Sequence, residues 1–132
     1  MNKPAATSVN LHPILAERWS PRSFDNQHEV NTEDLTGILE AARWSPSANN
    51  FQPWKFLVAK RGDTNFEKIS KTLTGFNATW APTASLFILV AAQTTNDDGT
   101  ARPYALYDCG IASANATTEA HHRGLAVHQI AG

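Results

Sequence analysis

Residues 45–54 read Ser45-Pro46-Ser47-Ala48-Asn49-Asn50-Phe51-Gln52-Pro53-Trp54. This stretch is rich in turn-forming and amide-bearing residues, which predicts a loop that offers many hydrogen-bond donors and acceptors. Pro53 stands directly before an apolar run and would fix the direction in which the chain enters a strand. Such a loop suits a planar heteroaromatic ring that carries carbonyls and ring nitrogens. The simpler alternative is a plain turn rich in Ser and Asn, which would not need Gln-Pro-Trp.

The loop separates a predicted helix from a predicted strand. The helix is expected over residues 33–43, because apolar residues recur there at i, i+3, i+4 and i+7 after a cap at Asn31 or Thr32. Residues 54–60 form an apolar run that ends in turn-forming residues, which predicts a strand. Residues 85–92 are apolar on both faces, which predicts a central strand covered on both sides.

Four further elements complete the prediction. A short helix capped by Asn10 is expected near the N-terminus, and another short helix over residues 65–73. The longest helix is predicted over residues 103–123, where Gly124 would end it. Residues 125–130 predict a last strand.

Composition and length narrow the class of protein. The chain has 132 residues, a formal net charge of −1 and 42% hydrophobic residues, which indicates one globular domain without a general attraction to nucleic acid or acidic membranes. No apolar run has the length of a membrane span and no signal peptide is visible, so we expect a cytoplasmic protein. Residues 1–10 predict a loose N-terminal arm ahead of a domain over residues 11–132. The five histidines lack the spacing of metal ligands, and no metal site is expected.

A second polar segment lies near the N-terminus and reads Arg18-Trp19-Ser20-Pro21-Arg22-Ser23-Phe24. Guanidinium and hydroxyl groups are the donors that hold a phosphate or a polyhydroxyl chain. Two solvated arginines beside a turn are the alternative for this segment taken alone.

Together the two segments resemble the nitroreductase family of FMN-dependent oxidoreductases. The family's N-terminal pattern of alternating Arg, Ser, Arg or Lys, and an aromatic residue is matched by Arg18, Ser20, Arg22 and Phe24. Its second pattern, Pro-Ser-x-x-Asn-x-Gln-Pro-Trp, is matched by Pro46, Ser47, Asn50, Gln52, Pro53 and Trp54. Weaker matches are Gly75-x-Asn77 and Asp108-Cys109-Gly110. The resemblance covers essentially residues 13–132 and implies a nitroreductase-like α+β fold, with a mainly antiparallel central sheet flanked by helices.

The resemblance also implies which residues bind FMN. Arg18 and Ser20 would hold its phosphate and ribityl end, and Arg22 would lie near the N1 and O2 edge of the flavin. Asn77 would form a hydrogen bond with the pyrimidine edge of the flavin ring. Family members are homodimers, and the loop that would reach the flavin of the other subunit contains Pro46, Ser47, Ala48 and Asn50. No side chain is expected to act as a base or nucleophile, because FMN itself carries the chemistry.

The activity that the resemblance implies is transfer of reducing equivalents from NAD(P)H to a nitroaromatic, quinone or similar acceptor by a ping-pong mechanism. One alternative is another flavin reaction on the same fold, such as reductive dehalogenation. A second is a non-catalytic flavin-binding protein or a truncated fragment. The family's C-terminal portion is not found after Gly132, and we interpret the chain as C-terminally truncated.

Two expectations concern packing. Trp44, Trp54 and Trp80 are expected in the core, and Cys109 is expected to be a small apolar filler in a buried helix. The long helix over residues 103–123 is rich in small residues, which predicts close packing against other helices and against a second copy of the chain.

Overall fold

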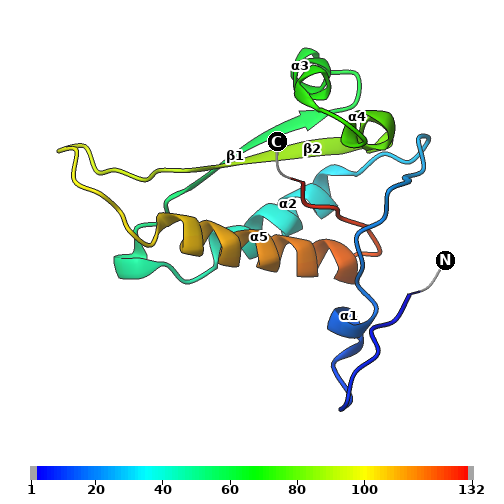
Figure 1. Ribbon diagram of the computed structural model, residues 1–132, viewed down its shortest axis with the longest axis horizontal. Helices are drawn as coiled ribbons and strands as arrows, with labels where there is room; N and C mark the ends of the chain where they lie inside the picture. Colours follow the sequence, from blue (N-terminus) through cyan, green and yellow to red (C-terminus); the bar gives the residue numbers. More distant parts are fainter. Residues whose placement is uncertain (1–2, 131–132) are drawn as a thin grey trace.

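The fold consists of a small antiparallel sheet between two layers of helices, seen in the computed structural model, which describes residues 3–130 (Figure 1). The sheet pairs β1 (Trp54–Lys60) with β2 (Leu86–Ala92). One face carries α2 (Thr32–Arg43) and α5 (Ala105–His122), and the other carries α3 (Thr64–Thr72). The expected arrangement, an antiparallel sheet flanked by helices in an α+β chain, is therefore observed.

Short elements connect these layers. They are α1 (Pro13–Ala16), α4 (Asn77–Trp80) and the 3-10 turns η1 (Ala48–Asn50) and η2 (Ala81–Thr83). The N-terminal segment with α1 lies near the C-terminal end of α5, and α4 lies beside the sheet on the side of α3 (Figure 1). None of the helices in residues 3–130 combines the length and the apolar character needed to cross a bilayer.

The register of the sheet explains which side chains reach each helical layer. The register runs from the pair Trp54–Ala92 to the pair Lys60–Leu86. Along each strand, successive residues point to opposite faces of the sheet. Trp54 packs with α5 on one face. On the other face Phe66 of α3 stacks on Phe87 of β2, with ring centroids 4.5 Å apart. The predicted bounds of β1 are confirmed, and β2 begins one residue later than expected.

The prediction that β2 is covered on both sides is wrong. Leu89 is 49% exposed and Val90 is 41% exposed. Leu89 shares the face of Phe87, of which α3 covers only the Phe87 end. Val90 points to the opposite face, in a sheet that has only two strands within residues 3–130. An apolar run indicates a strand, but the number of layers over it depends on elements distant in sequence.

The core lies between α2, α5 and β1. Its central residues are small except for one tryptophan: Ala42, Trp54, Cys109 and Ala112. The core positions expected for Trp54 and Trp80 are confirmed, since their exposed fractions are 7% and 6%. The core position expected for Trp44 is wrong, because Trp44 is 77% exposed and lies beside the Arg43 guanidinium. It follows Ala42 by two residues, which is about 200° around the helix from the buried stripe.

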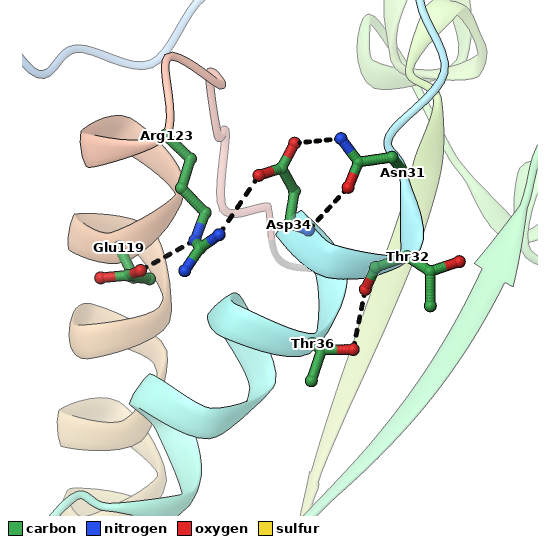
Figure 2. A network of polar contacts seen from close by, with 6 residues as sticks. All are labelled: Asn31, Thr32, Asp34, Thr36, Glu119 and Arg123. Atoms are coloured by element: carbon green, nitrogen blue, oxygen red, sulfur yellow. Dashed lines mark hydrogen bonds and ion pairs between the residues drawn. The ribbon is translucent and has the colours of Figure 1, made fainter.

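The two long helices are joined by a polar network at one end (Figure 2). The cap predicted for α2 is confirmed, because the Asp34 amide donates to the Asn31 side chain at 2.8 Å. Arg123, at the end of α5, donates to Asp34 at 3.3 Å and to Glu119 at 2.8 Å. These bonds, led by the one to Glu119, raise the pKa of Arg123. Gly37 leaves room for the Arg123 guanidinium, which a Cβ at this position would overlap.

The ends of the chain differ most from the predictions. The cap of α1 is His12 rather than Asn10, and its ring Nδ1 accepts from the Ile14 amide at 3.3 Å. Gly124 adopts a φ of 77° and ends α5 as expected. The strand predicted over residues 125–130 is wrong, since that segment has no strand partner in the described part of the chain. Side-chain hydrogen bonds from His128 and Gln129 hold it instead.

The buried thiol of Cys109 gives a pH prediction. Burial, and secondly the charge of Asp108, raises the pKa of Cys109, so the folded chain disfavours the thiolate. The contribution of this group to stability is complete below the unfolded-state pKa, about 8.5, and is lost as the pH rises through the higher folded-state value. We expect urea unfolding to show stability that falls more steeply above pH 8 in the wild type than in Cys109→Ala. Equal slopes in the two proteins would contradict this.

Candidate functional site

The first group of candidate residues lies just after α1. Arg18 is half-buried and its Nη1 lies 3.5 Å from the exposed Ser20 hydroxyl. Arg18 also lines a hollow of about 190 Å³ against the end of α5, together with Trp19, Thr117, His121, Gly124, Leu125, Ala126 and Val127. The structure thus brings Arg18 and Ser20 together, as the sequence implied, beside the C-terminal end of α5.

Arg22 approaches the segment that carries Asn77. Its guanidinium carbon lies 5.8 Å from the centre of the Phe76 ring, and Asn77, directly after Phe76, begins α4. Asn77 is half-buried and Arg22 is exposed. Neither Arg18 nor Arg22 forms an ion pair with a carboxylate in residues 3–130. Two unneutralised cations, a hydroxyl and an amide therefore lie on two connected segments at one end of the fold.

The loop after α2 has a strained backbone. Asn49, Asn50 and Gln52 have φ values of 51°, 57° and 47°, which residues other than glycine rarely adopt. Two bonds within the loop hold this conformation: the Gln52 amide N–H donates to the Ser47 hydroxyl at 2.9 Å, and its side chain donates to Asn50 at 3.1 Å. Gln52 therefore supports the conformation of the loop. Strain of this kind persists only where surrounding contacts enforce it.

The contact that ties this loop to α5 comes from Asp108, which the sequence indicates only as part of a weaker family match and with no role. Asp108 is 4% exposed, and its Oδ2 accepts from the Ala48 amide at 3.1 Å. A second tie joins Asn115 to the buried Ser45 hydroxyl at 2.8 Å. The two partners of the first contact are separated by 60 residues in the chain, so no local pattern could indicate it.

Removing this acceptor should loosen the loop. In Asp108→Ala the half-buried Ala48 amide would lose its partner, which costs about 1–3 kcal/mol where water cannot replace the bond. We expect faster hydrogen exchange at the Ala48 amide and a lower free energy of unfolding. Asp108→Asn keeps an oxygen acceptor and is expected to retain part of the protection. Unchanged exchange in Asp108→Ala would show that the tie does not order the loop.

The structure does not bring the two groups of candidate residues together within one chain. Ser47, Ala48 and their neighbours Pro46 and Asn50 lie at the start of α5, near Asp108, whereas Arg18 lies near His121 (Figure 1). Asp108 and His121 are separated by about 20 Å along the helix axis. The loop and Arg18 therefore lie near opposite ends of α5.

One contact near the first group was also missed from the sequence. The His128 ring lies 2.8 Å from the Pro21 carbonyl and packs on Trp80. Pro21 stands between Ser20 and Arg22, and Trp80 ends α4. His128 and Pro21 are 107 residues apart in the chain, so only the fold reveals their contact.

Comparison with known proteins agrees with this fold. A family model described as the nitroreductase family matches residues 15–132. The oxygen-insensitive NAD(P)H nitroreductase of Salmonella typhimurium is 30% identical over 93 residues, which are 68% of this chain and 42% of that protein.

Solved structures give the same assignment. One described as an oxidoreductase containing FMN matches with a TM-score of 0.86 and 31% identity, over 93% of this chain and 64% of that chain. An FMN-dependent nitroreductase from Clostridium difficile matches with a TM-score of 0.66 and 28% identity, over 86% of this chain and 61% of that one. The chain spans less than half the length of the curated relatives it matches.

Proposed function

This chain belongs to the nitroreductase family, and from that membership we propose that it functions as an FMN-dependent oxidoreductase. The reaction is transfer of reducing equivalents from NAD(P)H to a nitroaromatic, quinone or similar acceptor in the cytoplasm. The observation that carries this proposal is a group of four hydrogen-bond donors: two arginines without a carboxylate partner in residues 3–130, a hydroxyl and an amide. They are Arg18, Arg22, Ser20 and Asn77.

The chemistry of this donor set fits FMN. A phosphate needs cationic and hydroxyl donors, which Arg18 and Ser20 supply from positions two residues apart. The flavin ring presents carbonyls and ring nitrogens along its polar edge, and Arg22 and Asn77 offer a cation and an amide for them. The two pairs lie on segments that meet where Arg22 approaches Phe76. One anionic ligand with a polar ring is therefore matched at both ends.

The side chains position and stabilise charge, and none is proposed as a base or nucleophile. Bound FMN would supply the redox chemistry, by which reducing equivalents would pass from NAD(P)H to the acceptor in a ping-pong mechanism. Arg22 would place a fixed positive charge where negative charge collects on the reduced ring, which favours reduction. Asn77 would orient the ring through its amide.

A homodimer is part of the proposal. Pro46, Ser47, Ala48 and Asn50 would contact FMN held by a second copy, since about 20 Å of helix separates their loop from Arg18 in the same chain. Support for a covered surface comes from Leu106 and Tyr107 of α5, which are 72% and 71% exposed. Large apolar side chains that neighbour one another on a helix are typical of interfaces.

FMN titration and NAD(P)H oxidation together test the function. We expect the protein to bind FMN, measured by the change in flavin fluorescence, and to oxidise NAD(P)H when a nitroaromatic or quinone acceptor is added. FMN binding without turnover would favour a flavin-binding protein instead. Failure to bind FMN in the folded protein would overturn the proposal.

Mixing two weakened variants tests the shared site. Arg18→Ala would damage the site on its own chain, and Asn50→Ala would damage the site of its partner. A mixed dimer then retains one intact site, so co-expression should restore a population of sites with wild-type FMN affinity, which neither variant has alone. No recovery, with light scattering showing monomers that still bind FMN in the wild type, would contradict a site shared between subunits.

A further inference from the structure

The strongest unexplained feature outside the proposed FMN ligands is the side chain of His128. Its Nδ1 lies 2.8 Å from the carbonyl oxygen of Pro21. A carbonyl can only accept, so Nδ1 carries a proton and donates it to this bond. The tautomer of the ring is thereby set by its partner.

The same ring packs against α4, the helix that carries Asn77. The centroids of His128 and Trp80 are 4.5 Å apart with an angle of 37° between the rings. Trp80 is 6% exposed and also packs against Phe24, at 6.1 Å. It ends the helix that Asn77 begins. One imidazole therefore links the segment of Ser20 and Arg22 to the helix of Asn77.

The segment of residues 18–24 has few other restraints. Within residues 3–130 its backbone makes one hydrogen bond, the one that Pro21 accepts from His128. The anchor itself is fixed, because the neighbouring Gln129 side chain donates to Thr117 of α5 at 2.8 Å. Residues 128–129 therefore connect α5 to the backbone between Arg18 and Arg22.

From this geometry we infer that His128 is a positioning residue for FMN binding: its Nδ1–H bond to Pro21 holds Ser20 and Arg22 in place beside α4. The inference rests on the proposed function. His128 itself does not contact the ligand. It acts by ordering the segment before the ligand arrives, so that less conformational freedom is lost on binding.

Two substitutions separate the hydrogen bond from the ring packing. His128→Phe keeps an aromatic ring against Trp80 but has no donor. His128→Asn loses the ring but offers an amide N–H close to the position of Nδ1. We expect His128→Phe to weaken FMN binding about tenfold, as loss of one hydrogen bond does. We expect His128→Asn to keep more of the affinity than His128→Phe, although it is the less stable of the two.

The comparison needs a control and a readout of stability. His122→Phe changes an exposed histidine on α5 and should leave FMN affinity unaltered. Urea unfolding, followed by circular dichroism, identifies conditions in which all variants are folded. A role in packing alone would give the reverse order, with His128→Asn losing more affinity than His128→Phe. That order, or wild-type affinity in His128→Phe, would overturn the inference.

A measurement without ligand keeps this test independent of the proposed function. Backbone ¹⁵N relaxation at Ser20 and Arg22 should show order parameters near 0.85 in the wild type and below about 0.6 in His128→Phe. Equal order in both proteins would overturn the positioning role, whether or not FMN binds. If FMN fails to bind the wild type while the order parameters change as expected, the proposed function fails and the positioning of this segment by His128 stands.

Discussion

Replacing Arg18 by Ala is expected to weaken FMN binding roughly 10- to 150-fold, because a hydrogen bond to a charged group contributes about 1.5–3 kcal/mol. Arg18 is half-buried beside α5 and has no carboxylate partner in residues 3–130, so its charge is available to a phosphate. Flavin fluorescence during titration of the apoprotein with FMN measures the dissociation constant.

Two further variants make this result specific. Arg43→Ala removes a positive charge from the exposed surface of α2 and should leave FMN affinity nearly unchanged. Arg18→Lys keeps the charge but loses the two-pronged geometry of the guanidinium, and should lie between Arg18→Ala and the wild type. Equal losses in Arg18→Ala and Arg43→Ala would show a general effect of charge, and Arg18 would then not be a phosphate ligand.

The elements that could be predicted from the sequence are those whose signals are local. The cap at Asn31 lies three residues from the amide that it accepts, and the apolar stripe of α2 repeats within two turns. The bounds of β1 follow from Pro53 before it and Gly62 after it. In each case the residues that decide the structure are neighbours along the chain.

Burial could not be predicted in the same way. Trp44 and Trp54 are the same residue type ten positions apart, yet one is 77% exposed and the other 7% exposed. The difference arises because residues of α2 and α5 pack around Trp54, and Trp44 is not part of that core cluster. Leu89 and Val90 show the same limit, because the elements that cover one end of the sheet are distant in sequence.

The candidate site residues are predicted from their residue types and remain predictions, and their contacts with other segments depend on the fold. The sequence indicates cationic and amide residues at Arg18, Arg22 and Asn77. It cannot show that Arg22 meets Phe76, because no periodic pattern connects a loop to a distant short helix. The supporting contacts of Asp108 and His128 span 60 and 107 residues and depend wholly on tertiary structure.

Replacing Trp54 by Ala is expected to have the largest effect on stability. Trp54 is the one large side chain at the centre of the core cluster, where it contacts alanines and Cys109 from two helices. Truncating a buried Trp to Ala removes the apolar contacts and leaves a cavity, which costs about 3–5 kcal/mol. That is a large share of the 5–15 kcal/mol that is typical of whole domains. Urea unfolding followed by far-UV circular dichroism measures the loss.

Trp44→Ala is the matched control, because it removes the same side chain from an exposed position. Its expected effect is within about 0.5 kcal/mol, since Trp44 is 77% exposed and its contact with Arg43 lies at the surface. If Trp54→Ala does not fold, Trp54→Phe, which keeps an aromatic ring in the cluster, should fold with intermediate stability. Losses of equal size in Trp44→Ala and Trp54→Ala would show that Trp44 is buried in the protein in solution, and the core would then extend beyond the contacts made within one chain.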